Sequence, residues 1–129
     1  MNVGDKAIIM KQFSEQDIKI FSDISCDRNP IHLDEEYAKT TRFKKRIVHG
    51  FLVGSLISAV IATKLPGPGS IYLSQTMDFN APVFHGDTIT AEVTIEEIKR
   101  NRIFILGTKC INQNGLIVIE GKAHILFEP

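Results

Sequence analysis

Residues 47–63, IVHGFLVGSLISAVIAT, decide the fold of this chain of 129 residues. The stretch contains no Asp, Glu, Lys or Arg and ends at the helix-breaking sequence KLPGPG, residues 64–69. A membrane span needs about 20 consecutive apolar residues, whereas this stretch is shorter and is interrupted by His49, Ser55 and Ser58. The better interpretation is a buried helix that is apolar on nearly every side and is surrounded by protein.

After this helix, the spacing of apolar residues changes to the period of two that is typical of β-strands. Residues 88–96, TITAEVTIE, alternate strictly between apolar and polar side chains. Three further segments are predicted strands: 70–79, 102–111 and 116–127. Tight turns are indicated at Asn101 and at Asn114-Gly115. The second half therefore predicts an antiparallel meander, and we expect it to wrap around the apolar helix.

The segments before the helix are shorter. Residues 3–10 predict a strand, and Ser14 with Asp17 has the pattern of a helix-capping box. The helix that starts there is expected to end before Cys26, with one apolar face made of Ile18, Phe21 and Ile24. Pro30 disfavours helical angles at the residue before it, so residues 25–33 are expected to form an ordered loop rather than a helix. Acidic residues 34–36 favour a new helix start.

Composition narrows the class of protein. Fifteen basic residues balance fifteen acidic ones, which argues against a general nucleic-acid binder, and 43% of the residues are hydrophobic, as in a globular protein. No internal repeat or low-complexity segment divides the chain, so we expect one domain over residues 1–129. The two cysteines form no CxxC pair, and the start, MNVGDKAIIMKQF, lacks a long apolar region. We therefore expect a cytoplasmic protein that is not embedded in a membrane.

Asp27 and His32 are the candidate catalytic residues, in a segment stiffened by Asn29-Pro30. A carboxylate and an imidazole are a common pair for moving protons near neutral pH. The spacing by itself leaves a structural alternative open, in which Asp27 caps a local turn and His32 bonds to a backbone carbonyl.

Three segments, SCDRNPIHLDEEYA, IVHGFLVGSLIS and LPGPGSIYLSQTMDFNAPVFHGD, resemble the MaoC-like (R)-specific enoyl-CoA hydratases. The resemblance runs from about Ser14 to Phe127 and centres on the pattern Asp-x-Asn-Pro-x-His. It implies an α+β hot-dog fold, an antiparallel β-sheet wrapped around a long hydrophobic central helix, and a homodimer. It also implies addition of water to trans-2-enoyl-CoA to give (R)-3-hydroxyacyl-CoA, without a metal or an organic cofactor. Short hydratases of this type resemble those that supply polyhydroxyalkanoate monomers from fatty acid metabolism.

The resemblance assigns Asp27 and His32 to gripping a water molecule and exchanging protons, with Asn29 shaping their loop. Gly50, at the start of the buried helix, matches the family's backbone donor to the thioester oxyanion, and unpaired N–H groups at a helix start suit that role. Alternatively, or in addition, Gly50 permits close packing there. Ser58 matches a residue that hydrogen-bonds Asp27, and the other option for its hydroxyl is the Gly54 carbonyl.

Several features fit the resemblance less closely. Family members commonly have Gly where this chain has Cys26; we expect the loop to survive and the thiol to be packed. The basic residues Arg42, Lys44, Lys45 and Arg46 predict a solvated loop or contacts to coenzyme A phosphates. The remaining histidines, His49, His85 and His124, have no metal-binding spacing, and His49 is expected to shape the entrance of the helix.

Three other functions remain open at this point. They are a 3-hydroxyacyl-[acyl-carrier-protein] dehydratase, which runs the same chemistry in reverse on another carrier, an acyl-CoA thioesterase of the hot-dog fold, and a non-catalytic hot-dog subunit that binds acyl thioesters.

Overall fold

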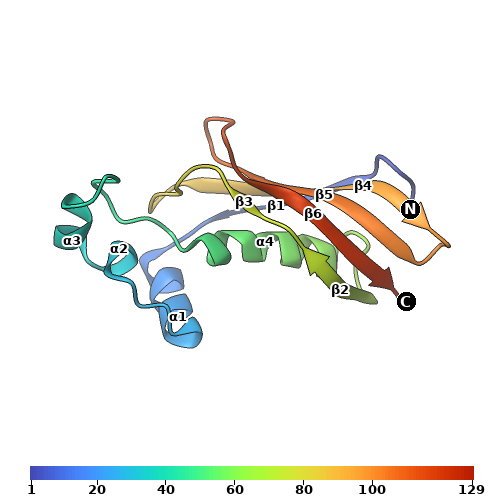
Figure 1. Cartoon of the computed structure of the whole chain (residues 1–129), viewed down its shortest axis with the longest axis horizontal. Coiled ribbons are helices and arrows are strands. Elements are labelled where there is room, and N and C mark those ends of the chain that lie inside the picture. Colours follow the sequence, from blue (N-terminus) through green and yellow to red (C-terminus); the bar gives the residue numbers. More distant parts are fainter.

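The computed structural model describes residues 1–129 and contains one antiparallel sheet with a long helix lying against it (Figure 1). The strands are paired in the order β1-β4-β5-β6-β2, and β3 pairs with β6 beside β2. The bounds of the strands are β1 Lys6–Gln12, β2 Ser70–Gln75, β3 Asp78–Phe79, β4 Thr88–Lys99, β5 Ile103–Ile111 and β6 Ile117–Phe127. The helices are α1 Glu15–Ser25, α2 Pro30–Leu33, α3 Glu35–Lys39 and α4 Gly50–Thr63. This arrangement confirms the hot-dog fold that was expected from the sequence.

The core lies between the sheet and α4. Along β4 the buried residues are Ile89, Ala91, Val93 and Ile95, as the strict alternation predicts. They meet buried aliphatic side chains of α4, namely Val53, Ile57, Val60 and Ile61. Apolar surface removed from water contributes about 25 cal/mol per Å², so this contact stabilises the fold. The three consecutive strands β4, β5 and β6 form the predicted meander.

Helix α4 is buried on one side only. It begins at Gly50, because residues 47–49 are extended and Ile47 forms a bridge with Phe84. On the side away from the sheet, Phe51 is 68% exposed, and the side chains of Ser55 and Ser58 are exposed as well. The prediction that protein surrounds the helix is therefore wrong for this face within a single chain. None of the helices has the length and apolar character needed to cross a membrane.

Helix α1 starts as predicted. The Ser14 Oγ accepts a hydrogen bond from the Asp17 N–H at 3.1 Å, and the Asp17 carboxylate accepts one from the Ser14 N–H at 2.9 Å. The predicted apolar face is only partly correct, since Ile18 is buried but Ile24 is 79% exposed. Ser22 is the other buried residue of this helix, because it faces the start of α4.

The segment around Pro30 differs from the prediction of a loop. Residues 26–29 are not helical, but Pro30–Leu33 forms the short helix α2. Proline suits the first position of a helix because the N–H that it lacks would have no partner there. Asn29 caps the helix, its Oδ1 accepting from the Ile31 N–H at 3.2 Å. Asp34 caps α3 in the same way, which confirms the predicted helix start.

Candidate active site

The turn that carries Asp27 begins at Cys26, the residue that ends α1. Its φ angle of 66° lies in the left-handed region, where Gly carries no steric penalty. Cysteine adopts the conformation and the turn is retained, as expected. The thiol, however, is exposed rather than packed, so that part of the prediction is wrong.

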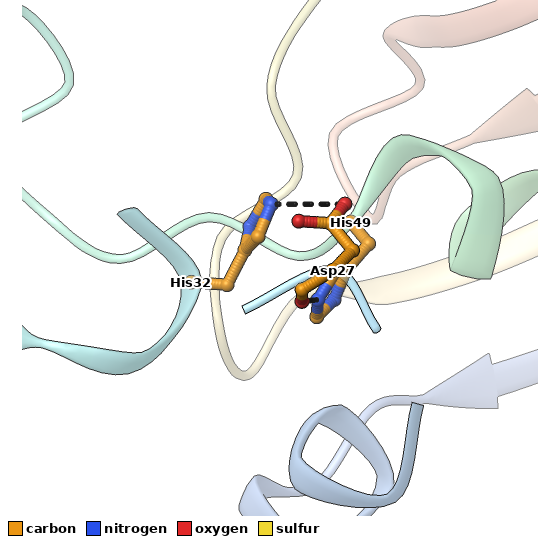
Figure 2. Close-up of side chains that lie close together, drawn as sticks. All are labelled: Asp27, His32 and His49. Carbon is orange, nitrogen blue, oxygen red and sulfur yellow. Dashed lines mark hydrogen bonds and ion pairs between the residues drawn. The ribbon is translucent and has the colours of Figure 1, made fainter. Parts of the chain in front are cut away.

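Asp27 and His32 face each other across a short gap (Figure 2). The Asp27 Oδ2 and the His32 Nε2 are 3.9 Å apart. The Asp27 Oδ1 accepts a hydrogen bond from the Asn29 N–H at 3.3 Å, so the turn itself orients the carboxylate. The imidazole is buried, whereas the carboxylate is half-exposed. The pair therefore sits at the boundary between the interior and solvent, where a substrate can reach it.

A second contact fixes the tautomer of His32. Its Nδ1 lies 2.8 Å from the Ile47 carbonyl oxygen, which can only accept a hydrogen bond. We therefore assign the proton of neutral His32 to Nδ1, which leaves a lone pair on Nε2 facing Asp27. The gap of 3.9 Å is too long for a direct hydrogen bond. A water molecule that donates one hydrogen to Nε2 and the other to the carboxylate would fit this arrangement of two acceptors.

His49 is a member of this site that the sequence interpretation placed only at the entrance of α4. It is the residue before the first turn of α4, and its ring stacks on the ring of His32 with a centroid distance of 3.9 Å. Its Nε2 lies 3.1 Å from the Asp27 carbonyl oxygen and 2.9 Å from the Ser22 Oγ. Burial, above all, lowers the pKa of His49 below its ordinary value of 6.5. Its position directly before Gly50 was the available signal.

The amino end of α4 presents unpaired hydrogen-bond donors beside the pair. The first bond along the helix joins the Val53 N–H to the His49 carbonyl, so the N–H groups of Gly50, Phe51 and Leu52 have no partner in the chain. Gly50 also lines a cleft of about 410 Å³ between the start of α4 and the segment 79–83. A Cβ atom on Gly50 would lie 2.7 Å from the Phe79 ring, so the expected close packing is present here.

Ser58 makes neither of the two hydrogen bonds expected for it. Its exposed hydroxyl contacts neither Asp27 nor the Gly54 carbonyl, and it lies on the open face of α4 in a shallow groove with Tyr72 and Met77. The contact to Asp27 is absent because two helical turns, about 12 Å along the axis, separate Ser58 from Gly50 at the start of the helix. Within one chain, the orientation of Asp27 comes instead from Asn29 and the turn.

The four basic residues before α4 differ in whether they form ion pairs within the chain. Arg46 donates hydrogen bonds to Glu15 and Glu35, so its charge is used within the protein. Arg42 lines the cleft and lies over the Phe43 ring, and it forms no ion pair. Lys44 and Lys45 form no ion pair either, and Lys45 lies over the Phe84 ring, so Arg42 is the cation of this run that lines the cleft.

The donor atoms of Asp27, His32 and His49 lie within 4.8 Å of one another, close enough to be considered as a metal site. However, the His32 Nδ1 and the His49 Nε2 already form hydrogen bonds within the chain. The accessible groups that remain are a carboxylate and the His32 Nε2, because the unbonded His49 Nδ1 is fully buried. This set suits proton transfer better than metal binding, for which a third free ligand is usual.

A sheet packed on one central helix, with a carboxylate and an imidazole facing each other at the amino end of that helix, defines a hot-dog protein with a candidate proton-transfer site. The MaoC like domain matches residues 5–112, and the chain belongs to this family. The match includes Asp27, His32, His49 and Gly50, so all the groups described at the helix start lie within the family domain.

Relatives with known names agree with this assignment. The chain is 46% identical to the (R)-specific enoyl-CoA hydratase of Rhodospirillum rubrum, over 95% of this chain and 85% of that protein. It is 39% identical to a mitochondrial 3-hydroxyacyl-[acyl-carrier-protein] dehydratase of Arabidopsis thaliana, over 98% of this chain and 78% of that protein. The structure of an (R)-hydratase from A. caviae involved in PHA biosynthesis superimposes with a TM-score of 0.96, at 40% identity, and covers 99% of this chain and 98% of that one.

Proposed function

We propose that this protein adds water to trans-2-enoyl-CoA and gives (R)-3-hydroxyacyl-CoA, in a reversible reaction. The observation that carries the proposal is the pair of acceptors, Asp27 Oδ2 and His32 Nε2, which face each other 3.9 Å apart at the amino end of α4. The family and the names of the relatives supply the substrate class and the (R) configuration. The enzyme is a hydro-lyase, and its own residues suffice for each proton transfer.

In this mechanism the water molecule donates its hydrogens to Asp27 and His32, and its oxygen attacks C3 of the enoyl group. The pair takes one proton from the water as the C3–O bond forms, and it returns one proton to C2. If His32 takes the proton, the resulting imidazolium lies next to the Asp27 carboxylate, which stabilises the positive charge. General acid–base catalysis of this kind contributes about 10² to 10⁴ in rate.

The thioester oxygen gains negative charge as C3 is attacked, and Gly50 is the proposed donor to it. Its N–H has no partner in the chain and stands at the positive end of the α4 dipole. A donor of this type typically contributes about 10² to 10³ in rate. The acyl chain would enter along the cleft beside Gly50, and Arg42, at the rim of that cleft, is placed to meet phosphate groups of the carrier.

The test uses the purified full-length chain and a short trans-2-enoyl-CoA. We expect the absorbance of the enoyl thioester to fall without release of free thiol, and chiral analysis to identify the (R) product. Asp27→Asn and His32→Ala should each lower kcat by about 10² to 10⁴, while His124→Ala, an exposed histidine away from the site, should not. Release of thiol would indicate a thioesterase, binding without turnover a non-catalytic subunit, and a nearly active Asp27 or His32 variant would contradict the mechanism.

The acyl carrier protein is the second candidate carrier, because one relative at 39% identity is named as a dehydratase of that substrate. The same enoyl group should be offered on both carriers under the same conditions. We expect the higher kcat/KM with the coenzyme A thioester. A preference of tenfold or more for the acyl carrier protein would reassign the substrate and leave the roles of Asp27 and His32 unchanged.

A homodimer forms part of the proposal. The open side of α4 and the strands β2 and β3 at the edge of the sheet carry exposed apolar side chains, namely Phe51, Ile71, Tyr72, Leu73 and Phe79. The outer edge of β2 is also unpaired, and a second copy would satisfy both features and bury Ser58. We expect a dimer by light scattering, a monomer for Leu73→Lys, and an unchanged dimer for Met10→Lys on the opposite edge strand. A monomeric wild type would exclude the proposed homodimer.

The two free thiols fit a reducing compartment, and we therefore propose a cytoplasmic location. Residues 1–129 are proposed to act as one domain, because the cleft, the pair and the core share α4.

A further inference from the structure

The buried polar side chains of the protein are concentrated at one place. Four polar residues are buried, and three of them, Ser22, His32 and His49, are in contact in a single cluster. His32 belongs to the proposed mechanism, but the mechanism uses neither Ser22 nor His49. A buried polar group costs free energy unless its hydrogen bonds are made, so the pair of Ser22 and His49 calls for an explanation.

His49 connects the separate parts that carry the dyad. Its Nε2 contacts Ser22 in α1 and the main-chain oxygen of Asp27, and the face of its ring supports the ring of His32. The ring of Phe21 packs edge-on against the His49 ring, at a centroid distance of 4.9 Å. Figure 2 shows His49 lying next to both members of the dyad. One side chain thus touches the backbone of one member and the imidazole of the other.

The contacts also determine which nitrogen of His49 carries the proton. The Asp27 carbonyl oxygen can only accept, and the His49 Nδ1 is buried without any partner. We therefore assign the proton to Nε2, where it is shared between the Asp27 carbonyl and the Ser22 hydroxyl, because a buried N–H without an acceptor would cost more than a buried lone pair. A second proton, on Nδ1, would be buried without an acceptor.

This arrangement favours a neutral His49 beside His32, a member of the pair that exchanges protons with the water. The titratable groups around it are His32, Asp27 and His85, and a positive charge on His49 would repel one on His32 at a ring distance of 3.9 Å. Burial is the largest cause of the lowered pKa of His49, and the charge of His32 acts in the same direction. A neutral His49 leaves His32 as the only imidazole of the stack that takes a proton.

We propose that His49, held by Ser22, is a positioning residue for the catalytic dyad: its Nε2–H fixes the main chain of Asp27, and its neutral ring fixes the plane of His32. This inference rests on the proposed function, in which Asp27 and His32 grip the reacting water. His49 itself touches neither water nor substrate in this scheme. Displacing reacting groups by about 1 Å costs on the order of 10² in rate, which sets the size of the expected effect.

The kinetic test uses His49→Phe, which keeps an aromatic ring but removes the donor, and His49→Gln, which keeps an N–H donor. We expect His49→Phe to lower kcat about 10²-fold with little change in KM, and His49→Gln to recover about tenfold, the worth of one hydrogen bond. His124→Gln is the matched control at an exposed histidine and should behave as wild type. An unchanged kcat for folded His49→Phe, or a rise in KM in its place, would overturn the proposal.

Ser22→Ala keeps the proposal testable if His49→Phe does not fold. Because Ser22 acts through the His49 Nε2–H, its loss should lower kcat several-fold in the wild type, about 1 kcal/mol for one hydrogen bond, and an unchanged kcat would overturn the proposal. Where His49→Phe folds, Ser22→Ala should add nothing in that background. Fully additive losses would show that Ser22 acts independently and would contradict the coupling.

A spectroscopic measurement separates this inference from the proposed function. In long-range ¹H–¹⁵N spectra, His49 should be the Nε2–H tautomer and should stay neutral when the pH falls through 6.5. An Nδ1–H tautomer, or titration at or above pH 6.5, would overturn the inference. The readout needs no turnover, so it stays decisive if the wild type hydrates no enoyl thioester, a result that would refute the proposed function alone.

Discussion

The protein has two regions that are held together by different forces. The body, formed by the sheet and α4, is stabilised by buried aliphatic side chains and by hydrogen bonds between paired strands. The overhang, residues 15–39 with α1, α2 and α3, lies at the end of the body where α4 begins (Figure 1). Its groups that face the body include Ser22 and His32, which are polar. The candidate catalytic residues thus lie in the region with the smaller apolar core.

Ion pairs on the surface also link the overhang to the body. Arg46, in the segment before α4, donates to Glu15 at the start of α1 and to Glu35 at the start of α3. One guanidinium therefore joins both helices to the body, and the bond to Arg46 holds the pKa of Glu15 below 4.5. Stability and activity should therefore be separable: changes in the core of the body should alter folding, and changes in the overhang should alter the geometry of the dyad.

The largest effect on stability is expected for Leu106→Ala in the body. Leu106 is fully buried in β5, and truncating a buried leucine costs about 2–5 kcal/mol through lost burial and the cavity left behind. Urea unfolding should give this loss, while kcat per folded molecule stays close to wild type. Ile8→Ala, at a half-exposed position on β1, is the control and should cost much less. A tenfold fall in kcat of folded Leu106→Ala would contradict the separation of the two regions.

The same contrast explains what the sequence could and could not predict. The strands of the body follow from local period, because one face of β4 is buried from Ile89 to Ile95 without interruption. Asp27, His32 and Gly50 were found from their residue types and a family pattern. These features are local, so they can be recognised without knowing the fold.

The remaining features depend on partners distant in the chain. His49 joins the site through partners that are distant in the chain, such as Ser22, 27 residues earlier in α1. Ile24 satisfies a helical apolar pattern but has no surface in the chain to cover it. Ser58 lies in a stretch of low polarity, yet the face that it shares with Phe51 is open in a single chain. Period alone cannot distinguish an apolar face that meets the core from one that does not.

Arg46→Ala should have a moderate effect, confined to the overhang. The pairs with Glu15 and Glu35 are worth about 1 kcal/mol or less, because both carboxylates are more than half exposed and screened by water. The folded-state pKa of Glu15 is lowered, so its contribution is present above pH 4.5 and is lost as the pH falls through the folded pKa. The difference in stability between wild type and Arg46→Ala should therefore shrink in acid and in high salt.

Hydrogen exchange locates this effect. Amides of α1 and α3 should exchange faster in Arg46→Ala, whereas those of β4 and β5 should not change. Lys39→Ala is the control, because it removes an ion pair with Glu36 inside α3 that does not reach the body. Faster exchange in the central strands would mean that Arg46 stabilises the body, and the two regions would then not be independent.

The smallest effect is expected at Cys26, where the overhang turns toward Asp27. A non-glycine residue in the left-handed region costs about 1–2 kcal/mol, and Gly returns about 0.5–1 kcal/mol of that through the greater entropy of the unfolded chain. Cys26→Gly should therefore stabilise the protein by less than about 1 kcal/mol in a thermal or urea unfolding measurement. Cys26→Ala keeps the backbone cost and removes only the exposed thiol, so it should match wild type in both stability and kcat. Loss of turnover in Cys26→Ala would assign the thiol a part in the chemistry, and equal stability of all three proteins would mean that this turn stores no strain.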